Sequence, residues 1–566
     1  MAGSIRKAVL GMLAGAAASA PLALSLGHPR SSVAIGMVIG IAYAVSTGHT
    51  PRAYIDNLMA ASALGVPLWG LISAVALPLL SGQRLEWSAE EMRTHFPSLV
   101  GWVLYGALLG LFTQALRDLA EHVFGPEAAV VAPVPREKKR IVILGGGFAG
   151  MKTAECLEEE LRTNLSAMMT LISETNALLF TPMLAEVAGS TLEPSHISTP
   201  LRSSLRRTEF IRGRVNAIDL ENRKVVLASD SPTGQLVVPY DQLVLALGSV
   251  SNYLGMANIE KLAFNFKSLL DAIRIRNHVI EMFERADRES DASQRAALLS
   301  FVIAGGGFAG VELAGALNDF ARGILADYPS LSPSELNVVL VHSRDRILPE
   351  LSESLARYAQ KKMEARGVKF RLNARLSDAQ PGVIVVSDGE IRAQTLVWTA
   401  GSAPNPLLKS QPFERDKRGA VKVDFTLAVP GYAGVWALGD CAAVNDAKTG
   451  KPCPPTAQFA IREAATVARN IAAQLGERPL KEFHFDSLGA LCVVGHQTAC
   501  AELSIPFARS KSVRFSGLLA WLMWRGIYLS KLPGMERKIR VLMDWMIELF
   551  FPRDIVQTID LQQEKP

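Results

Sequence analysis

The hexapeptide Gly145-Gly-Gly-Phe-Ala-Gly150 is repeated without change as Gly305-Gly-Gly-Phe-Ala-Gly310. An apolar run precedes each copy, Arg140-Ile-Val-Ile-Leu144 in the first case and Ser300-Phe-Val-Ile-Ala304 in the second, and a helical pattern follows each. A glycine-rich loop between a buried strand and a helix is typical of dinucleotide-binding βαβ units. Two copies in this context predict two Rossmann-like domains, and therefore an α/β fold with parallel sheets.

Three glycines of each copy fit the pattern GxGxxG, and each has its own physical role. The first permits a tight turn, the second lets the backbone approach a pyrophosphate, and the third lets the helix pack on the strand. The helix N-terminus then offers free N–H groups to the phosphates. The predicted contacts are Gly145, Gly147, Phe148, Ala149 and Gly150 in the first copy, and Gly305, Gly307, Phe308, Ala309 and Gly310 in the second.

An acidic residue at the end of the following strand can bind the ribose hydroxyls of a dinucleotide. Glu174 follows the predicted strand 168–173 and is the expected ribose ligand of the first unit. The strand of the second unit, 337–341, ends instead in His342 and, two residues on, Arg344. A strand end without a carboxylate tolerates a 2′-phosphate, so NADH and NADPH both remain possible hydride donors. His342 is either an adenosine contact or a hydrogen-bonded surface residue.

Length and composition restrict the remaining possibilities. The 566 residues are too many for one core, and the net charge of +5 is too small and scattered to indicate a nucleic-acid partner. The five cysteines contain no CxxC pair, and the nine histidines show no metal-ligand spacing, so we expect no metal site. Two dinucleotide units in one chain instead predict an electron path between a hydride donor and a flavin.

The first 116 residues have a different composition from the rest. Four stretches lack Asp, Glu, Lys and Arg, at residues 8–27, 31–51, 57–83 and 94–116, and each holds an apolar run close to the ~20 residues that span a bilayer. Glycines at four-residue spacing allow helices to approach closely in lipid, at Gly11 and Gly15, Gly36 and Gly40, and Gly106 and Gly110. We predict an all-α domain of four transmembrane helices in residues 1–125 and a linker in residues 126–139.

A secretory signal peptide is the alternative for the first stretch, because Ala18-Ser19-Ala20 resembles a cleavage site. Three further apolar stretches favour the membrane domain. The distribution of basic residues predicts the cell inner (cytoplasmic) membrane, with the catalytic domain facing the cytoplasm. The residues expected on the cytoplasmic side are Arg6, Lys7, Arg52, Arg117, Arg136, Lys138, Lys139 and Arg140.

Three further phrases follow the first glycine motif: Leu243-Val-Leu-Ala-Leu-Gly-Ser249, Val397-Trp-Thr-Ala-Gly401 and Val435-Trp-Ala-Leu-Gly-Asp440. With these phrases, the chain from about residue 140 onward closely resembles the type II NADH:quinone oxidoreductases, which are two-dinucleotide-binding flavoproteins. The resemblance implies non-covalent FAD in residues 140–266 and 390–480, and NAD(P)H in residues 267–389. It further implies that electrons pass to quinone without proton pumping.

The resemblance also assigns roles to single residues. Asp440 matches an aspartate that contacts the ribityl chain of FAD, and Glu312 matches a glutamate beside the nicotinamide. Ordinary alternatives are a turn aspartate at 440 and a first-turn helix acid at 312. The segment Leu178-Leu-Phe-Thr-Pro-Met-Leu-Ala-Glu-Val187 matches the neighbourhood of the flavin ring. The remaining implied cofactor contacts are Thr181, Pro182, Gly248, Gly401 and Gly439.

The segment that resembles the family's quinone site departs from the family pattern Ala-Gln-x-Ala-x-Gln. This chain has Ala457-Gln458-Phe459-Ala460-Ile461-Arg462. The resemblance implies that Ala457 and Gln458 lie at the quinone, with Gln458 catalytic. Arg462 replaces the second glutamine, so either Arg462 hydrogen-bonds a quinone oxygen or the acceptor is a different one. Relatives that need thiols beside the flavin are disfavoured, because no cysteine occurs between Cys156 and Cys441.

The tail, residues 481–566, contains an aromatic and basic stretch at 517–551 that Pro533-Gly534 divides into two helical pieces. Tryptophan, tyrosine and lysine on amphipathic helices are typical of the bilayer interface, so we expect membrane-docking helices there. A homodimer interface is the alternative.

The favoured hypothesis is an NAD(P)H:quinone oxidoreductase whose partners are the quinone pool and the lipid bilayer. The second is a redox-sensing membrane protein in which the flavoprotein regulates the four-span domain. A reductase of a soluble protein such as a ferredoxin is disfavoured, because a soluble partner does not require membrane helices.

Overall fold

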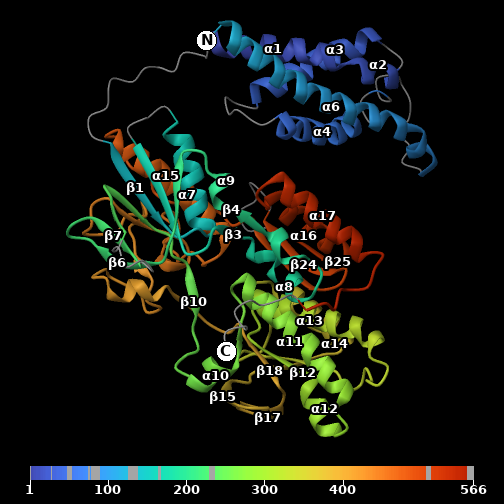
Figure 1. Ribbon diagram of the computed structural model, residues 1–566, viewed down its shortest axis with the longest axis vertical. Coiled ribbons are helices and arrows are strands. Elements are labelled where there is room, and N and C mark those ends of the chain that lie inside the picture. Colours follow the sequence, from blue (N-terminus) through green and yellow to red (C-terminus); the bar gives the residue numbers. More distant parts are fainter. Residues whose placement is uncertain are drawn as a thin grey trace. The chain divides into compact units, whose positions relative to one another are not determined.

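The computed structural model describes residues 2–26, 29–46, 54–73, 77, 89–124, 138–162, 167–228, 236–504 and 512–557. The chain divides into two compact units, Met1–Pro133 and Val134–Pro566 (Figure 1). The first contains the helices coloured blue in Figure 1, and the second contains the parallel sheets.

The described helices of the first unit pack through glycines. Helix α1 lies against α3 because Gly15 faces Gly36, where an added Cβ would stand 2.0 Å from the Gly36 carbonyl oxygen. Helix α4 lies against α6 in the same way, with a Cβ on Gly106 only 2.3 Å from the Ala61 carbonyl oxygen. The helices are α1 (Ala2–Ala18), α2 (Ala20–Leu26), α3 (Pro29–Ser46), α4 (Tyr54–Leu71) and α6 (Ala89–Phe124). The glycine spacing therefore acts as predicted, by allowing close helix contact.

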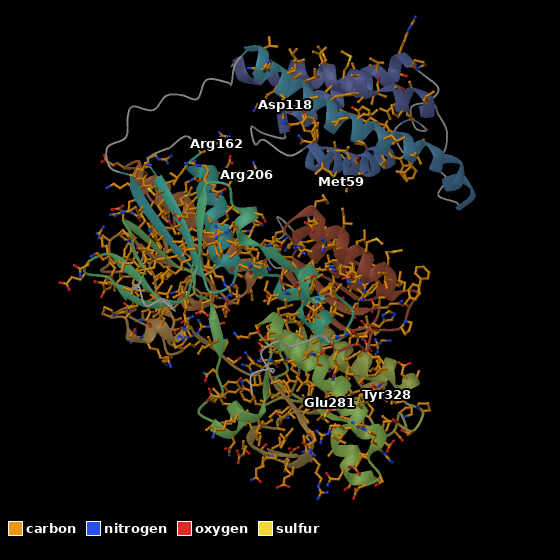
Figure 2. The ribbon with its side chains drawn as sticks, in the orientation of Figure 1. Met59, Asp118, Arg162, Arg206, Glu281 and Tyr328 are labelled. Carbon is orange, nitrogen blue, oxygen red and sulfur yellow. The ribbon has the colours of Figure 1, made fainter. Side chains whose placement is uncertain are left out.

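A polar chain joins α4 to α6. Asn57 Nδ2 donates to Gln114 Oε1 at 2.6 Å, and Gln114 Nε2 donates to Asp118 Oδ1 at 2.8 Å. The Tyr54 hydroxyl donates to the other carboxylate oxygen of Asp118, which is labelled in Figure 2. These four polar side chains therefore satisfy one another across the two helices.

The prediction of four transmembrane helices is not supported. Within the described residues, one helix is long and apolar enough to cross a bilayer, at Ser98–Ala120, and Pro29–Val45 is apolar but shorter. Helices α1, α3 and α4 have 17 or 18 residues, which makes each about 27 Å long. A hydrocarbon core is about 30 Å thick, so the described parts of these helices are slightly shorter than a span.

The first glycine motif lies in a five-stranded sheet with the order β21-β9-β1-β2-β5, in which all neighbours are parallel. Strand β1 is central, and Ile143 pairs with Leu171 on one side and Val244 on the other. Helices α7 and α15 pack against each other beside this sheet (Figure 1). The bounds are β1 (Lys139–Leu144), β2 (Ala167–Ser173), β5 (Thr208–Arg212), β9 (Gln242–Leu245), β21 (Val435–Ala437), α7 (Phe148–Glu160) and α15 (Ala457–Leu475).

The second motif lies in a matching parallel sheet with the order β11-β18-β12-β13-β14. The antiparallel pair β10 (Ser249–Ser251) and β19 (Ser402–Pro404) carries the chain between the two sheets. The predicted α/β fold with duplicated units is therefore confirmed. The bounds are β11 (Phe264–Asn265), β12 (Ser300–Ala304), β13 (Asn337–Val341), β14 (Val368–Arg371), β18 (Thr395–Trp398), α11 (Leu269–Arg288), α13 (Phe308–Ile324) and α14 (Glu353–Ala365).

Shorter elements complete these domains. One group joins the strands around the first sheet: β3 (Ala177–Leu179), η2 (Thr181–Met183), α8 (Leu184–Ala188), η3 (Pro194–Ile197), β4 (Ser198–Pro200), α9 (Leu201–Ser204), β6 (Val215–Asp219), β7 (Lys224–Leu227), β8 (Val237–Pro239), η5 (Pro406–Ser410), β20 (Val421–Lys422), η6 (Gly439–Cys441) and β22 (Ala442–Ala443). The other surrounds the second sheet: α10 (Ala257–Leu262), α12 (Ala292–Leu298), η4 (Leu325–Asp327), β15 (Leu376–Gln380), β16 (Val383–Val386) and β17 (Gly389–Arg392).

The tail forms an antiparallel sheet of β23 (Gly489–Gly495), β24 (Thr498–Ser504) and β25 (Ser512–Gly517), followed by α16 (Leu518–Lys531) and α17 (Met535–Glu548). Strand β23 packs on α13. The buried Arg276 of α11 donates hydrogen bonds to the carbonyls of Asp554 and Val556, so the last described residues are fastened to the second nucleotide domain.

The tail corrects one expectation about its aromatic residues. Trp521, Trp524 and Trp545 are at most 6% exposed and pack inward, so they are not interface anchors. The exposed apolar side chains are aliphatic residues, methionines and phenylalanines instead. They are Leu518, Leu519, Leu522, Met535, Ile539, Leu542, Met543, Met546, Ile547, Leu549, Phe550 and Phe551.

We expect the substitution Gly310→Ala to destabilise the second nucleotide domain by about 1–3 kcal/mol, the usual cost of overpacking. The new Cβ would lie 1.9 Å from the Gly305 carbonyl oxygen and 2.6 Å from Thr399 Oγ1. Thermal unfolding of the flavin-loaded protein measures the effect. Gly323→Ala is the matched control, because its Cβ would meet no described atom within 4 Å on the same helix and should raise the unfolding temperature slightly. Equal unfolding temperatures for the two variants would contradict the packing argument.

Candidate cofactor and active site

The first glycine loop has the shape that a pyrophosphate requires. Gly145 has a φ of +108°, which favours glycine, and an added Cβ on Gly150 would lie 1.8 Å from the Gly145 carbonyl oxygen. Helix α7 begins after Gly147 without a side-chain cap from the described residues. A Cβ on Gly147 would meet no described atom within 4 Å, so space lies open in front of the free amides. These residues therefore fit a bound dinucleotide.

The second loop repeats this geometry. Gly305 has a φ of +121°, and helix α13 begins after Gly307, again without a side-chain cap from the described part of the chain. The surroundings differ at one point, because Glu350 Oε1 stands 3.5 Å from the position of a Cβ on Gly307. A carboxylate therefore lies beside the second loop, although the tip of β13 has none.

The residues after the glycines differ in exposure. The ring of Phe148 contacts Phe180 edge to face, with centroids 5.7 Å apart, and Ala149 is buried beside Gly439. Phe308 is half-buried against the core, whereas Ala309 is exposed. Phe148 and Phe308 are the first residues of α7 and α13, so the backbone amides of these four residues lie at helix N-termini, where a phosphate could be bound.

Glu174 stands where the sequence predicts it, directly after β2. Its side chain is 66% exposed, and the nearest cation is Arg214, 3.8 Å from Oε1. The carboxylate is therefore accessible to ribose hydroxyls.

His342 holds the second glycine loop in place. Its Nδ1 accepts a hydrogen bond from the Gly306 amide at 3.1 Å, which requires a neutral ring. Burial, and then the charge of Arg344, lowers the pKa of His342. His342 is therefore a half-buried support of the loop and not a surface residue, whereas Arg344 is exposed.

Asp440 belongs to a polar group that sequence reasoning found only in part. Ser249 Oγ donates to Asp440 Oδ2 at 2.8 Å, and Lys267 Nζ donates to Ser249 Oγ at 2.7 Å. Burial lowers the pKa of Lys267. The neighbouring Gly439 amide donates to Glu463 Oε2 at 2.7 Å, and burial raises the pKa of that carboxyl to about 7.

Lys267, Ser249 and Glu463 were not predicted as site residues. Ser249 ends a quoted phrase and offered a signal, but the other two join the loop only through the tertiary fold. The loop of Asp440 is therefore fixed from both sides by side chains distant in sequence.

The other implied contacts lie at turns and crossovers. Gly248 has a φ of +65° and Gly401 packs on Asn252, where a Cβ would lie 2.6 Å from its carbonyl oxygen. Thr181 is exposed and Pro182 half-buried, at the start of η2. These four residues occupy the two crossovers and the segment after β3, as the resemblance implies.

Glu312 lies in the first turns of α13 and lines a pocket shared with the segment 182–191 and the tail. Its Oε1 accepts a hydrogen bond from the Val493 amide at 3.3 Å. Burial, and to a smaller extent the nearby charge of Glu186, raises the pKa of Glu312 to about 8. The pocket is lined by Pro182, Ala185, Glu186, Thr191, Glu312, Ala316, Asp319, Val493, Gly495, His496, Trp521, Trp524, Arg525, Glu548 and Arg553.

The residues predicted for the quinone end make other contacts. Gln458 Nε2 donates to the Gly489 carbonyl at 3.1 Å, and its Oε1 accepts from the Leu488 amide at 2.8 Å, so both ends of its amide are engaged. Ala457 begins α15. The guanidinium of the exposed Arg462 lies 5.3 Å from the ring centroid of Phe485. Gln458 therefore fastens the tail to α15, while Arg462 retains accessible donors.

Comparison with known proteins agrees with this geometry. Residues 139–464 match the family described as pyridine nucleotide-disulphide oxidoreductase, which is the class that the duplicated fold and its glycine loops define. Residues 488–554 match the NDH2 C-terminal domain. The type II NADH:quinone oxidoreductase Ndh of Mycobacterium tuberculosis is 32% identical over 77% of this chain and 94% of its own length. A probable NADH dehydrogenase of Dictyostelium discoideum is 32% identical over 74% of this chain and 91% of its own length.

This chain belongs to the type II NADH:quinone oxidoreductase family. It is a membrane-associated flavoenzyme that uses FAD, NADH and quinone, as predicted. The redox-sensor alternative is not favoured. Both family matches begin after residue 138, so the first unit lies outside them.

Solved structures share the fold. The structure of NDH2 from Plasmodium falciparum in complex with NADH superimposes with a TM-score of 0.67 at 18% identity, and covers 74% of this chain and 100% of its own. The sulfide:quinone oxidoreductase of Aquifex aeolicus has a TM-score of 0.57 at 17% identity, and covers 73% of this chain and 95% of its own.

We expect Gly147→Val to reduce flavin retention at least tenfold, a loss of roughly 1.4 kcal/mol, while the fold persists. The new Cβ meets no described atom within 4 Å, so the side chain is expected to enter the space in front of the α7 amides. Flavin content after purification and the unfolding temperature of the apoprotein measure the two effects. Normal flavin content in a folded variant would show that the pyrophosphate does not pass over Gly147.

Proposed function

We propose that the two loops divide the cofactors, with FAD on Gly145–Gly150 and NADH on Gly305–Gly310. FAD then occupies residues 140–266 and 390–480, and NADH occupies residues 267–389. The observation that carries this assignment is the pocket of Glu312. It joins the helix after the second loop to the segment 182–191, which lies between β2 and β5 of the first sheet, so we infer that the two nucleotides meet there.

The reaction is NADH + H⁺ + quinone → NAD⁺ + quinol. Bound FAD supplies the carrier that receives the hydride and releases two electrons. The chain positions the nucleotides through the α7 and α13 amides, and binds ribose hydroxyls through Glu174. Asp440 is positioned for the ribityl chain by Ser249 and by the Gly439–Glu463 contact. Glu312 lies beside the nicotinamide.

We infer that NADH is preferred to NADPH because Glu350 supplies the carboxylate that β13 lacks at its tip. Glu350 is exposed beside Gly307, and a negative charge there disfavours a 2′-phosphate. The exposed Arg344 favours a 2′-phosphate, so the preference depends on which of the two side chains reaches the ribose.

Quinone is expected to approach along the tail. Arg462 is the candidate donor to a quinone oxygen, since both ends of the Gln458 amide are already engaged. Electrostatic repulsion from Arg462 contributes to the lowered pKa of Lys531, after burial, which places the end of α16 near Arg462.

The exposed apolar side chains of α16, α17 and residues 549–551 form the docking face that we propose for the bilayer. The first unit is a second anchor, through Ser98–Ala120. We place the enzyme at the inner membrane with its nucleotide domains on the cytoplasmic side, where NADH is available.

The function is tested by anaerobic half-reactions of the detergent-purified protein. NADH should bleach the flavin absorbance rapidly, and a short-chain quinone should restore it. Bleaching without recovery on quinone would contradict the assignment of the acceptor, and a purified protein without flavin would contradict the enzyme assignment.

Donor preference is tested by Glu350→Gln. We expect the ratio of kcat/KM for NADPH to that for NADH to rise roughly tenfold, since one unfavourable charge contact worth about 1.4 kcal/mol is removed. The exposed Glu353 of α14 gives the matched control, Glu353→Gln, which should leave the ratio unchanged. An unchanged ratio in Glu350→Gln would assign the preference to other residues.

A further inference from the structure

The NADH:quinone reaction consumes one proton from water in each turnover. NADH transfers a hydride, which carries two electrons and one hydrogen nucleus, whereas quinol formation takes up two electrons and two protons. The second proton must come from solvent and reach Glu312, which is only partly exposed. The inference below rests on this reaction and concerns how the chain delivers that proton.

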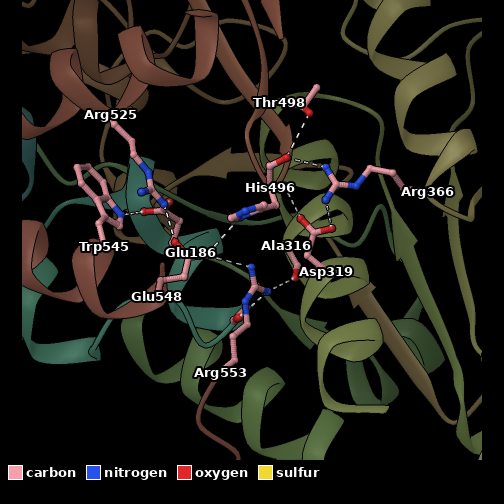
Figure 3. Close-up of polar contacts among 11 residues, drawn as sticks. Glu186, Ala316, Asp319, Arg366, His496, Thr498, Arg525, Trp545, Glu548 and Arg553 are labelled. Atoms are coloured by element: carbon pink, nitrogen blue, oxygen red, sulfur yellow. Dashed lines mark hydrogen bonds and ion pairs between the residues drawn. The ribbon is translucent and has the colours of Figure 1, made fainter. Parts of the chain in front are cut away.

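Glu186 of α8 lines the same pocket as Glu312, and sequence reasoning did not single it out. Its side chain is largely buried, and Trp545 Nε1 donates a hydrogen bond to its Oε2 at 3.1 Å (Figure 3). The nearest cation is Arg525, 3.9 Å from Oε1. A buried carboxyl with one hydrogen bond and a distant cation is poorly stabilised as an anion.

Arg525 could stabilise the ionised form of Glu186, but it pairs more closely with Glu548. Arg525 lies 2.7 Å from Glu548 Oε2, much closer than to Glu186, and Arg553 lies 3.3 Å from Glu548 Oε1. The Arg525 guanidinium is held there by the rings of Trp521 and Trp545, 3.8 and 4.6 Å from their centroids. Arg525 and Arg553 therefore both form ion pairs with the carboxylate of Glu548.

The protonation of the two acids follows from this arrangement. Burial alone raises the pKa of Glu548, but contacts from His496 and Arg525 lower it to about 2, so Glu548 stays ionised. Burial raises the pKa of Glu186 to about 7; Arg525 opposes this rise, and Glu548 adds to it. Glu186 therefore exchanges its proton near neutral pH, whereas Glu548 does not.

We propose that Glu186 is the relay residue that passes a proton from solvent to Glu312, and that the Arg525–Glu548 pair keeps Glu186 able to accept one. The O–H bond of Glu312 breaks as an O–H bond forms on the reduced quinone. The O–H bond of Glu186 then breaks as an O–H bond forms on Glu312, directly or through a water between them, and Glu186 regains a proton from water. The route to solvent passes His496, whose side chain is 38% exposed and lies 3.7 Å from Glu548.

The pocket has the chemistry to hold such a water. Arg525 Nε is a buried donor with no hydrogen-bond partner among the described residues, and Arg525 lines the same pocket as Glu186 and Glu312. An ordered water needs two to four polar partners, which Arg525, Glu186 and Glu312 provide. The charged or titratable groups that surround Glu186 are Arg525 on α16, Glu548 on α17, Arg553 after α17, Glu312 and Asp319 on α13, and His496 after β23.

The first test is infrared titration of the flavin-loaded enzyme without substrate. Glu186→Gln should remove a protonated-carboxyl band that disappears in the unsubstituted protein as the pH rises through about 7. In turnover, the same substitution should lower quinone reduction tenfold or more at pH 7. The initial reduction of the flavin by NADH, which takes up no proton from water, should be unchanged. Glu186→Asp should restore part of the quinone rate.

Two further variants should move the midpoint of that band in opposite directions. Glu548→Gln removes a negative charge and releases Arg525 to pair with Glu186. The midpoint pH of the carboxyl band should therefore fall, and the pH above which quinone turnover declines should fall with it. Trp545→Phe removes the hydrogen bond that favours the ionised form, so the midpoint rises. Glu353→Gln, at an exposed ion pair on α14, is the control that should move neither.

The outcomes separate the relay from the reaction itself. If the unsubstituted protein does not reduce quinone with NADH, the proposed function fails. If it does, and Glu186→Gln retains both the band and the pH profile, the relay is wrong. If Glu548→Gln fails to fold, Trp545→Phe is sufficient as a test, because an unchanged midpoint pH of the carboxyl band in that variant overturns the proposal.

Discussion

The whole catalytic half of this protein depends on how closely two helices approach two strands. At each glycine loop, the Cα of the third glycine lies against the carbonyl of the first, with no room for a methyl group. This contact brings the N-termini of α7 and α13 directly over the ends of β1 and β12. The amides of those helix ends can then bind phosphates, so the positions of both nucleotides follow from one steric constraint.

The nucleotide domains could be predicted because their determinants are local. Glycines, an apolar strand and a helical pattern lie within about 25 residues of each other, and Glu174 follows at the next strand end. The same is true of the helix break at Pro533-Gly534, where α16 ends at Lys531 and α17 begins at Met535. Local chemistry determined these features, and the tertiary fold did not override it.

Contacts between distant segments could not be predicted in this way. Glu463 binds the Gly439 amide, and Gln458 is engaged by the backbone at 488–489, only because the sheet and tail assemble around α15. The tryptophans of the tail were assigned to the bilayer because their composition suits an interface. In the structure, they enclose Arg525. Four transmembrane helices were also predicted from apolar composition, whereas only one helix of the described residues is long and apolar enough to cross a bilayer.

The hydrogen bonds from Arg276 to the carbonyls of Asp554 and Val556 have a consequence for biosynthesis. Arg276 is synthesised before its acceptors, which lie 278 and 280 residues later in the chain. A buried guanidinium is costly without its hydrogen bonds, so the second nucleotide domain reaches its final packing only after residues 554–556 have left the ribosome. Until then, the nascent protein is the form most exposed to proteases and chaperones.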